Sequence, residues 1–411
     1  MFEADVLDIA QRASTGDLPA ATRIDELLAE AHRRYSDHAD GAVADYIQIL
    51  AEAEPSSFGL ALVEVDGDAH SVGDARLPFS IPSISKAFVF ALVCEAIGHE
   101  AVHRRVGVNN TGLAFNSVMA VELNDGHPMN PMVNAGAIAT TAMVPGASAV
   151  EQWENIRLGL SRFAGRPLEL DGEVYRSEAR TNQRNEAIAR LLESYGRLDT
   201  DPLETVDVYT RQCALAVTAE DLAVMGATLA DGGVNPVTGE QVVSAEVARD
   251  TLAVLASCGL YERSGEWLFE TGLPAKSGVS GGIVAIAPGK GALGAYSPPL
   301  DRAGNSVGGS APAPISHARS ASTSSPPPRT PAAPPRRRDP AHDRTHRLRA
   351  APRGAPLLGA HDRTLPRAGA RVVQRRGPAH LPRRHGAGLR RAPPRRPAAP
   401  SSSTALRSPR S

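Results

Sequence analysis

Cysteine is scarce in this sequence, and its spacing excludes a fold held together by disulfides. The three cysteines, Cys94, Cys213 and Cys258, lie far apart among 411 residues and form no Cys-x-x-Cys pair. This usage is typical of a reducing compartment. Histidine gives no sign of a metal site, because six of the twelve histidines lie beyond residue 308 and the others lack ligand spacing. We therefore expect neither a metal ion nor another cofactor.

Long hydrophobic runs are also missing, which excludes a membrane-spanning helix. No stretch approaches the roughly 20 apolar residues that such a helix needs. The first residues, MFEADVLDIAQRA, are acidic and amphipathic, whereas a signal peptide has a basic segment followed by an apolar one. We expect a cytoplasmic protein with no membrane partner.

Lysine is the rarest charged residue, and arginine is unevenly distributed. The chain contains 41 arginines but only three lysines, Lys86, Lys276 and Lys290. Of the arginines, 22 lie in residues 309–411. The net charge is therefore about −20 over residues 1–308 and about +19 over the rest. The overall charge of −1 describes neither part.

The end of the chain differs from the rest in composition as well as in charge. After Val307 it consists mainly of proline, arginine, alanine and serine. Such a segment cannot bury enough apolar surface to offset the entropy lost on folding. We predict a folded domain over residues 1–307 and a disordered tail over residues 308–411. The positive charge of the tail would by itself suit binding to nucleic acid, but the acidic residues 1–308 offer no stripe of basic side chains. We therefore expect no nucleic-acid partner.

Hydrophobic patterns predict strands at both ends of the folded part and helices between them. Residues 58–74 alternate around an Asp-Gly turn, as in a β-hairpin, and residues 281–299 form two strands around a glycine-containing turn. Helices are predicted over residues 24–35, 87–98, 135–142 and 218–233, and over 177–196, which begins polar and becomes helical. An α+β arrangement follows, with an antiparallel sheet packed against helices.

The segment FSIPSISK, residues 79–86, places serines and a lysine at the mouth of the apolar helix. Ser83 and Lys86 are three residues apart, so a helix would bring them to one face. A serine hydroxyl is a weak nucleophile until a base takes its proton, and a lysine kept neutral by apolar surroundings can be that base. Backbone N–H groups at the helix start would stabilise an oxyanion. The alternative is that Ser83 only caps the helix; Ser80 and Ser85 are interpreted as polar surface.

A second lysine motif supports the catalytic interpretation. Lys276-Ser277-Gly278 stands just before the last two predicted strands. Together, Ser-x-x-Lys and Lys-Ser/Thr-Gly are the elements of the serine β-lactamases and penicillin-binding proteins. Two of the three lysines in the chain therefore stand where that arrangement needs them, although Lys276 taken alone also fits a solvated strand end.

From about Gly41 to Val307 the sequence resembles the serine-dependent glutaminases. The shared motifs, in family order, are VADYIQIL, SISK, FNS, NPMVNAGAI, SEARTNQRN, YTRQCAL, LASCGLYERSGEW, KSGVSGGI and YSPPLDRAGNSV. The resemblance implies a serine β-lactamase-like α/β (α+β) fold, with an antiparallel sheet flanked by helices plus a helical subdomain. It also implies hydrolysis of L-glutamine to L-glutamate and ammonia by a homodimer or homotetramer.

The resemblance also assigns catalytic roles. Ser83 would be the nucleophile and Lys86 the group that activates it. Tyr209 and Tyr261 would reach the reacting centre, with Tyr261 as our choice for proton transfer. Taken singly, both tyrosines also fit the edge of a hydrophobic core.

Substrate-binding roles follow from the same motifs. Asn134 would hold the substrate by hydrogen bonds, Glu178 would bind its α-amino group and Asn185 its α-carboxylate. The backbone N–H groups of Ser83 and Val279 would form the oxyanion hole, and Tyr46 would line the pocket. Glutamine carries an ammonium, a carboxylate and an amide, so an acid, amide donors and an oxyanion cradle suit it. Taken singly, Asn134 also fits a helix cap, Glu178 a surface acid and Asn185 a solvated helix face.

Two departures from the family pattern leave other functions open. The family usually has glutamine where this chain has Pro82, and proline where it has Gln48. Pro82 leaves the Ser83 N–H intact and suits a helix entry, but it removes a side chain that could contact substrate. The alternatives are a β-lactamase-like or esterase-like serine hydrolase, a catalytically impaired glutaminase homologue, and an inactive scaffold.

The tail after Val307 yields a prediction about the gene. By the resemblance, the chain should continue past GNSV into an amphipathic helix that packs on the sheet, but GGSAPAPISHARS breaks that pattern. Translation of GC-rich DNA in the wrong reading frame gives a sequence rich in arginine, proline and alanine. We therefore expect a frameshift in the gene. Translation of the other two frames from codon 307 should reveal the helix. If neither frame contains one, the tail is a genuine disordered extension.

Overall fold

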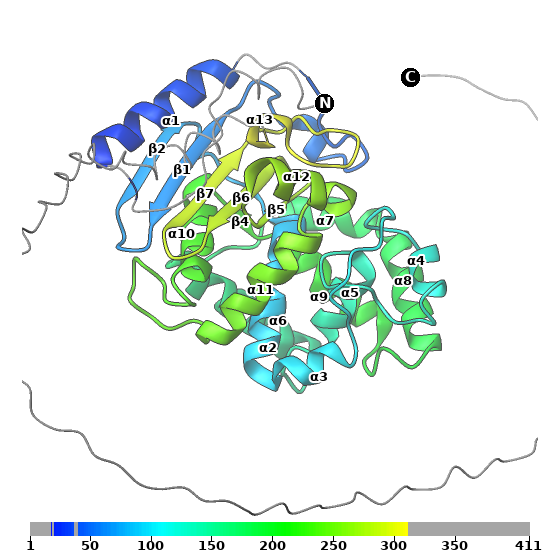
Figure 1. Ribbon diagram of the computed structural model, residues 1–411. Helices are drawn as coiled ribbons and strands as arrows, with labels where there is room; N and C mark the ends of the chain where they lie inside the picture. Colours follow the sequence, from blue (N-terminus) through cyan, green and yellow to red (C-terminus); the bar gives the residue numbers. More distant parts are fainter. Residues whose placement is uncertain (1–17, 19, 37–39, 311–411) are drawn as a thin grey trace, which may run out of the picture. The chain divides into compact units, whose positions relative to one another are not determined.

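The computed structural model describes residue 18 and residues 20–36 and 40–310 (Figure 1). All of them belong to the first of two compact units, Met1–Ala332. The second unit, Ala333–Ser411, lies outside the described residues, and so does the predicted tail, 308–411, except for its first three residues. Residues 308–310 are buried and belong to a short helix, so the tail prediction is wrong for these three residues.

Five antiparallel strands form the main sheet, in the order β2-β1-β7-β6-β5. Their bounds are Gly59–Glu64 for β1, Ala69–Gly73 for β2, Ala275–Ser277 for β5, Gly282–Ala287 for β6 and Gly291–Tyr296 for β7. β1 pairs with β7 from Gly59↔Tyr296 to Glu64↔Gly291, so the two ends of the folded part meet in the centre of the sheet. The predicted hairpin, the predicted terminal strands and the antiparallel sheet are confirmed.

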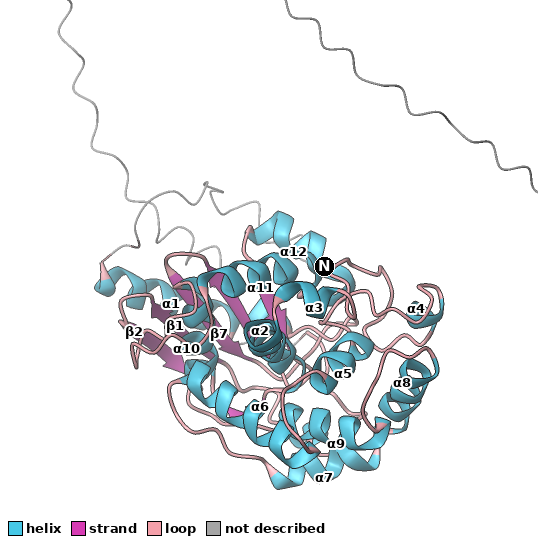
Figure 2. Ribbon diagram, turned by 90° about the horizontal axis from the view of Figure 1, so that it is seen from below, coloured by secondary structure: helices cyan, strands magenta, loops and turns pink. Residues whose placement is uncertain are grey.

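Helices cover both faces of this sheet. Leu60 and Leu62 of β1 face α1 (Ala21–Tyr35), and the alternate residues Ala61 and Val63 face α10 (Ala219–Ala230). Figures 1 and 2 show α1 and α10 on opposite sides of the strands. α10 lies close to β7 at Gly294, where a Cβ atom would come 2.1 Å from the Ala219 carbonyl oxygen. The result is a three-layer arrangement of helix, sheet and helix.

A second region consists mainly of helices. Its elements are α2 (Ser85–Ile97), α3 (His99–His103), α4 (Met119–Glu122), α5 (Asn134–Ala142), α6 (Ala149–Ala164), α7 (Gly172–Arg180), α8 (Gln183–Ser194) and α9 (Pro202–Cys213). α11 (Ala245–Cys258) and α12 (Ser264–Thr271) lead back to β5, and a two-stranded sheet pairs β3 (Phe79–Ser80) with β4 (Ala216–Val217). A final short helix, α13 (Val307–Ser310), contacts β6 and β7. Among the helices described, none has the length and apolar character needed to cross a bilayer.

Two details of the predicted helices need correction. The segment 177–196 forms two helices, and its polar beginning is already helical because α7 buries Val174 and Ser177 before the break at Thr181. The apolar helix begins at Ser85 rather than Ala87, and a 3₁₀ turn, Pro82–Ile84, precedes it. The predicted Thr218 cap of α10 is confirmed as a capping box with Asp221.

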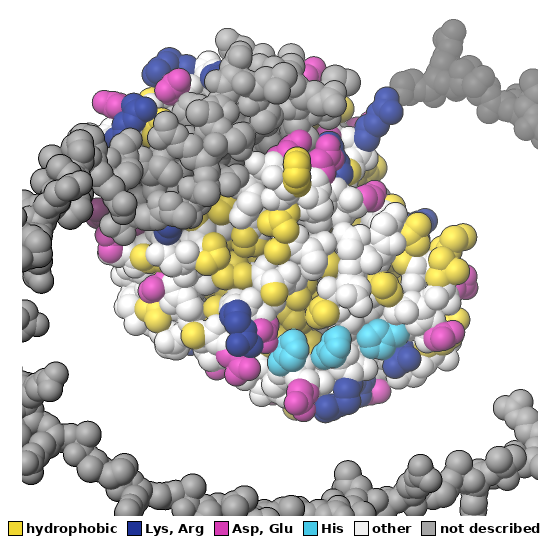
Figure 3. Space-filling model, in the orientation of Figure 1, with side chains coloured by type: hydrophobic (Ala, Val, Ile, Leu, Met, Phe, Trp, Pro, Cys, Tyr) yellow, Lys and Arg dark blue, Asp and Glu magenta, His cyan; other side chains and the backbone are white. Residues whose placement is uncertain are grey.

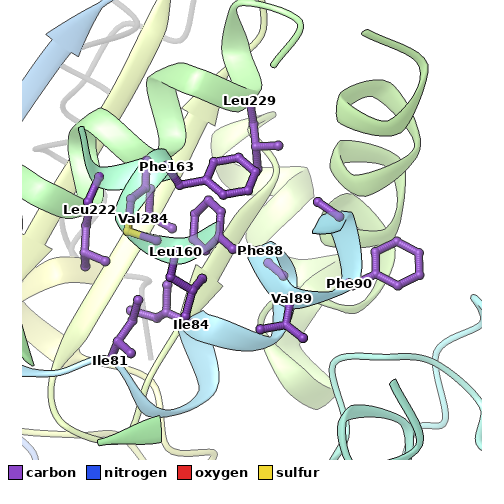
Figure 4. Close-up of a cluster of buried hydrophobic side chains, with 14 of the residues drawn as sticks. Ile81, Ile84, Phe88, Val89, Phe90, Leu160, Phe163, Leu222, Leu229 and Val284 are labelled. Carbon is purple, nitrogen blue, oxygen red and sulfur yellow. The ribbon is translucent and has the colours of Figure 1, made fainter. Parts of the chain in front are cut away.

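The turn that carries Ser83 is anchored in the hydrophobic core. Ile81 and Ile84, on either side of it, are both fully buried, and they pack in one cluster with Leu222 and Val284 (Figure 4). Phe88, one turn along α2, contacts the Phe163 ring at a centroid distance of 5.0 Å. Because close packing fixes the neighbouring side chains, the backbone at Ser83 has little freedom.

Charge on the described surface is mixed. Figure 3 shows hydrophobic side chains near the centre of one face and acidic and basic side chains interspersed toward its edge. This face therefore carries no field of a single sign.

Candidate active site

Seven of the nine predicted site residues line one cavity of about 850 Å³. They come from distant parts of the chain: Tyr46, Ser83, Asn134, Glu178, Asn185, Tyr209 and Val279. Pro82 also lines this cavity, and Tyr46, with 57% of its surface exposed, lies at the rim. The two remaining predicted residues, Lys86 and Tyr261, are almost fully buried and do not line it.

The serines beside Ser83 are structural rather than surface residues. Ser85 is fully buried, and its hydroxyl donates a 2.6 Å hydrogen bond to the Pro82 carbonyl oxygen. The Ser80 carbonyl accepts a 2.6 Å hydrogen bond from the Ser280 hydroxyl. The interpretation of Ser80 and Ser85 as polar surface is therefore wrong, because both residues are buried beneath the surface.

Lys86 lies in the first turn of α2 with only 1% of its surface exposed. Its Nζ donates to Asn134 Oδ1 at 2.7 Å and to the Met132 carbonyl at 3.3 Å. The ring centroids of Phe115 and Tyr209 lie 5.7 and 6.0 Å from the same nitrogen. Burial lowers the pKa of Lys86 to about 8, against smaller opposing effects of Cys213 and of the Glu178 charge. A large fraction of Lys86 is therefore neutral near pH 8, as a general base must be.

Tyr261 is held in a strained conformation beside strand β5. Its φ of 57° is unusual for a residue with a side chain, and such strain often marks a functional site. Its hydroxyl donates to the Ser277 carbonyl at 3.2 Å, and Lys276 Nζ donates to the same oxygen at 2.7 Å. Burial raises the pKa of Tyr261, and its hydrogen bond to Ser83 opposes that shift. Tyr261 therefore stays protonated and within reach of Ser83.

Lys276 is fully buried in β5, so it is not a solvated strand end. Its Nζ lies 4.2 Å from the centroid of the Tyr261 ring. Burial holds the pKa of Lys276 well below its usual range, and the Lys86 charge adds to this effect. Lys276 thus helps to position the Tyr261 ring and does not add a second full positive charge to the site.

A chain of amides links Lys86 to helices α8 and α9. Asn134 Nδ2 donates to Asn185 Oδ1 at 2.9 Å, and Asn185 Nδ2 donates to Asn182 Oδ1 at 2.8 Å. Asn182 Nδ2 in turn donates to the Thr210 hydroxyl. Each amide is oriented by its neighbour, so the oxygen of Asn134 is directed to Lys86. Asn134 therefore does not act as the side-chain cap of α5.

Glu178, on α7, forms no ion pair within the part of the chain that the structure describes. Its Oε1 atom is buried and has no hydrogen-bond partner among the described residues. Burial raises the pKa of Glu178 to about 8, and the Lys86 charge opposes this shift. An unpaired carboxylate on the wall of a cavity is suited to bind a cation such as an ammonium group. Glu178 is therefore not an ordinary surface acid.

Asn182 and Phe115 belong to the site but were not singled out from the sequence. Asn182 stands three residues before Asn185 in the motif SEARTNQRN, a spacing that a helix brings to one face. Phe115 opens the motif FNS and packs its ring 4.9 Å from that of Tyr261. Both signals were present in the quoted motifs. No three His, Cys, Asp or Glu side chains in the described ranges are grouped so as to hold a metal ion.

Comparison with known proteins identifies the family of this chain. The family model described as Glutaminase matches residues 41–314. The chain belongs to the glutaminase family. Glutaminase 2 of Yersinia pestis is 53% identical to it over 301 residues, which cover 73% of this chain and 88% of the relative. The glutaminase of Brucella canis is 54% identical over 267 residues, or 65% and 84% of the two chains.

Solved structures of glutaminases share the fold. The structure described as "Probable glutaminase ybaS" has a TM-score of 0.72 and 42% identity, and the match covers 74% of this chain and 97% of that one. The predicted serine β-lactamase-like fold is therefore confirmed. The family match ends at residue 314, close to where the composition of the chain changes.

The burial of Lys86 leads to a prediction for its ionisation. The chain has only three lysines, so lysines labelled with ¹³C at Cε give few signals, and Lys86→Met identifies that of Lys86. Because burial favours the neutral amine, this signal should titrate near pH 8, about two units below an unperturbed lysine. Glu178→Gln removes a charge that raises the Lys86 pKa, so it should move the titration lower still. A Lys86 that stays charged up to about pH 10 would contradict this account.

Proposed function

We propose that this member of the glutaminase family works through an acyl-enzyme formed on Ser83. The reaction is that of the family: an amidohydrolase converts L-glutamine to L-glutamate and ammonia. The observation that carries the proposal is the buried amine of Lys86, three residues from Ser83, with a pKa of about 8. A neutral lysine there can take the serine proton, which a surface lysine could not do near neutral pH.

In the acylation step, Ser83 Oγ attacks the side-chain amide carbon of glutamine and passes its proton to Lys86 Nζ. The backbone N–H groups of Ser83 and Val279 stabilise the oxyanion that forms. The C–N bond then breaks, and the leaving nitrogen gains a proton through Tyr261 and departs as ammonia. In deacylation, water attacks the ester carbon and passes a proton to the same groups. The bond from that carbon to Ser83 Oγ then breaks, Ser83 Oγ takes up this proton, and glutamate is released. The Ser83 side chain lowers the pKa of Tyr261 against the effect of burial, and this interaction supports the proton path.

Recognition of the amino-acid end is assigned to residues on α7 and α8. The unpartnered carboxylate of Glu178 pairs with the α-ammonium group of the substrate. Asn185 donates toward the α-carboxylate, and Asn134 holds Asn185 in place through their 2.9 Å hydrogen bond. Tyr209 and Tyr46 line the remaining wall and rim of the cavity. No cofactor takes part in this scheme.

We propose further that the protein is a cytoplasmic homo-oligomer, a dimer or a tetramer. The three cysteines are buried free thiols, which suits a reducing compartment. Phe269 on α12 has 91% of its surface exposed, and aromatic side chains are enriched in protein–protein interfaces. Sedimentation of the full chain at several concentrations measures its oligomeric state.

Removal of the nucleophile tests the mechanism. Ser83→Ala should abolish glutamine hydrolysis with little change in thermal stability, because alanine fits the space of serine. Lys86→Ala should slow acylation severely, since an unassisted hydroxyl stays protonated near neutral pH. Ser80→Ala is the matched control: it removes a buried hydroxyl that has no partner in the described structure, so activity should persist. Substantial turnover by folded Ser83→Ala would exclude the covalent mechanism.

The same assay separates the alternative functions. L-glutamine, L-asparagine and a chromogenic β-lactam are given to the purified protein side by side. Hydrolysis of glutamine alone supports the proposal, and cleavage of the β-lactam would favour a β-lactamase-like enzyme. If none of the three compounds is hydrolysed, the protein is an inactive scaffold.

Pro82 provides a test for an impaired site. It lines the cavity beside Ser83, where the family usually has glutamine. Pro82→Gln should lower KM more than it raises kcat, because one restored hydrogen bond contributes on the order of 1 kcal/mol, or several-fold in affinity. Pro82→Ala removes the ring without adding the amide and is the control. An unchanged or higher KM for Pro82→Gln would mean that the cavity is adapted to proline.

A further inference from the structure

A second cavity, of about 370 Å³, lies at the opposite end of α5 from Asn134. Residues of α2, α3 and α5 line it: Ile97 ends α2, Ala101 lies in α3, and Ala142 ends α5. One wall is apolar and is formed by Ile97, Ala101, Ala139, Ala142 and Met143. None of these residues lines the cavity that contains Ser83.

The other wall carries an excess of positive charge. Arg104, Arg105 and Arg197 line it with a single acid, Asp199. Asp199 forms an ion pair with Arg105. Within the described ranges, no ion pair engages Arg104 or Arg197, so two guanidinium groups remain without a carboxylate.

Arg197 is the clearest sign of a missing ligand. Its Nε atom is buried and has no hydrogen-bond partner among the described residues. Buried donors are nearly always satisfied, and one that is not calls for a specific explanation. A guanidinium presents its N–H groups as a planar fork that matches two oxygens of one carboxylate.

We propose that this cavity binds a small carboxylate with a short aliphatic chain. The carboxylate pairs with Arg197, with Arg104 close by, and the alkyl chain lies against Ile97, the alanines of α5 and Met143. The volume suits a molecule of the size of hexanoate. An inorganic anion would satisfy the guanidinium groups but would leave the apolar wall without a contact. The inference does not depend on the reaction at Ser83.

The methyl group of Met143 offers a local probe. The chain has six methionines, so ¹³C-methyl-methionine spectra of the full chain are simple, and Met143→Leu identifies the signal. Titration with hexanoate should shift this signal with saturation. Arg197→Gln should weaken the apparent affinity by on the order of tenfold or more, because it removes a charge-assisted pair.

The controls separate this site from general charge attraction. Arg190→Gln removes one charge from an exposed arginine on α8 outside the cavity, and its titration should match the unsubstituted chain. The arginines after residue 308 are present in both variants, so their effect cancels. The inference is overturned if Met143 does not respond, or if Arg197→Gln titrates like Arg190→Gln. It is equally overturned if hexanamide or inorganic phosphate produces the same shift at the same concentration as hexanoate.

Discussion

The burial of the Lys86 amine is the constraint on which the rest of the site depends. An isolated ammonium group is strongly disfavoured in apolar surroundings, so it must lose its proton or find acceptors. Both occur here: burial lowers the pKa to about 8, and Asn134 and Met132 accept hydrogen bonds. The desolvation comes from α2, which is buried on nearly every side because it packs against α5, α6 and α11. The apolar side chains of α2 thus stabilise the fold and also lower the pKa of Lys86.

Ser83 stands where the sheet and the helical region meet, and buried polar groups fix that junction. The hydroxyl of Ser85 donates to Pro82, Gln212 Nε2 donates to Ser85 Oγ at 3.2 Å, and Thr141 Oγ1 donates to Gln212 Oε1 at 3.1 Å. Three helices, α2, α5 and α9, therefore hold the turn through one hydrogen-bonded chain. A satisfied polar network of this kind rigidifies its surroundings, whereas a partly satisfied one would destabilise them. Three of the residues that position the proposed nucleophile, Ser85, Gln212 and Thr141, do not line the cavity themselves.

Local patterns predicted most of the fold, and tertiary partners account for what they missed. The Asp-Gly turn and the Thr218 cap are local signals, and both the hairpin and α10 form as expected. Ser85 was misinterpreted because its partner Gln212 lies 127 residues away. Asn134 could have been a helix cap or a site residue, and its partners Lys86 and Asn185 decide between the two. Both lie far away in the sequence, so the motif NPMVNAGAI alone does not reveal them. Seven of the nine residues suggested by the family motifs line one cavity, but the unpartnered Oε1 atom of Glu178 required the structure.

In the binding mode proposed above, the charges of the cavity favour an amino acid over a simple amide. In the empty site Glu178 and Lys86 each have a pKa of about 8, and ionised Glu178 raises the pKa of Lys86. A carboxylate needed to hold the substrate would therefore also favour the charged, inactive form of the base. The α-ammonium group of the substrate removes this conflict, because its positive charge offsets the field of Glu178 at Lys86. Binding then keeps Glu178 ionised and Lys86 neutral at the same pH. An amide without the ammonium group would neither keep Glu178 ionised nor keep Lys86 neutral. Glu178 and Lys86 together therefore both recognise the substrate and keep the base in its active form.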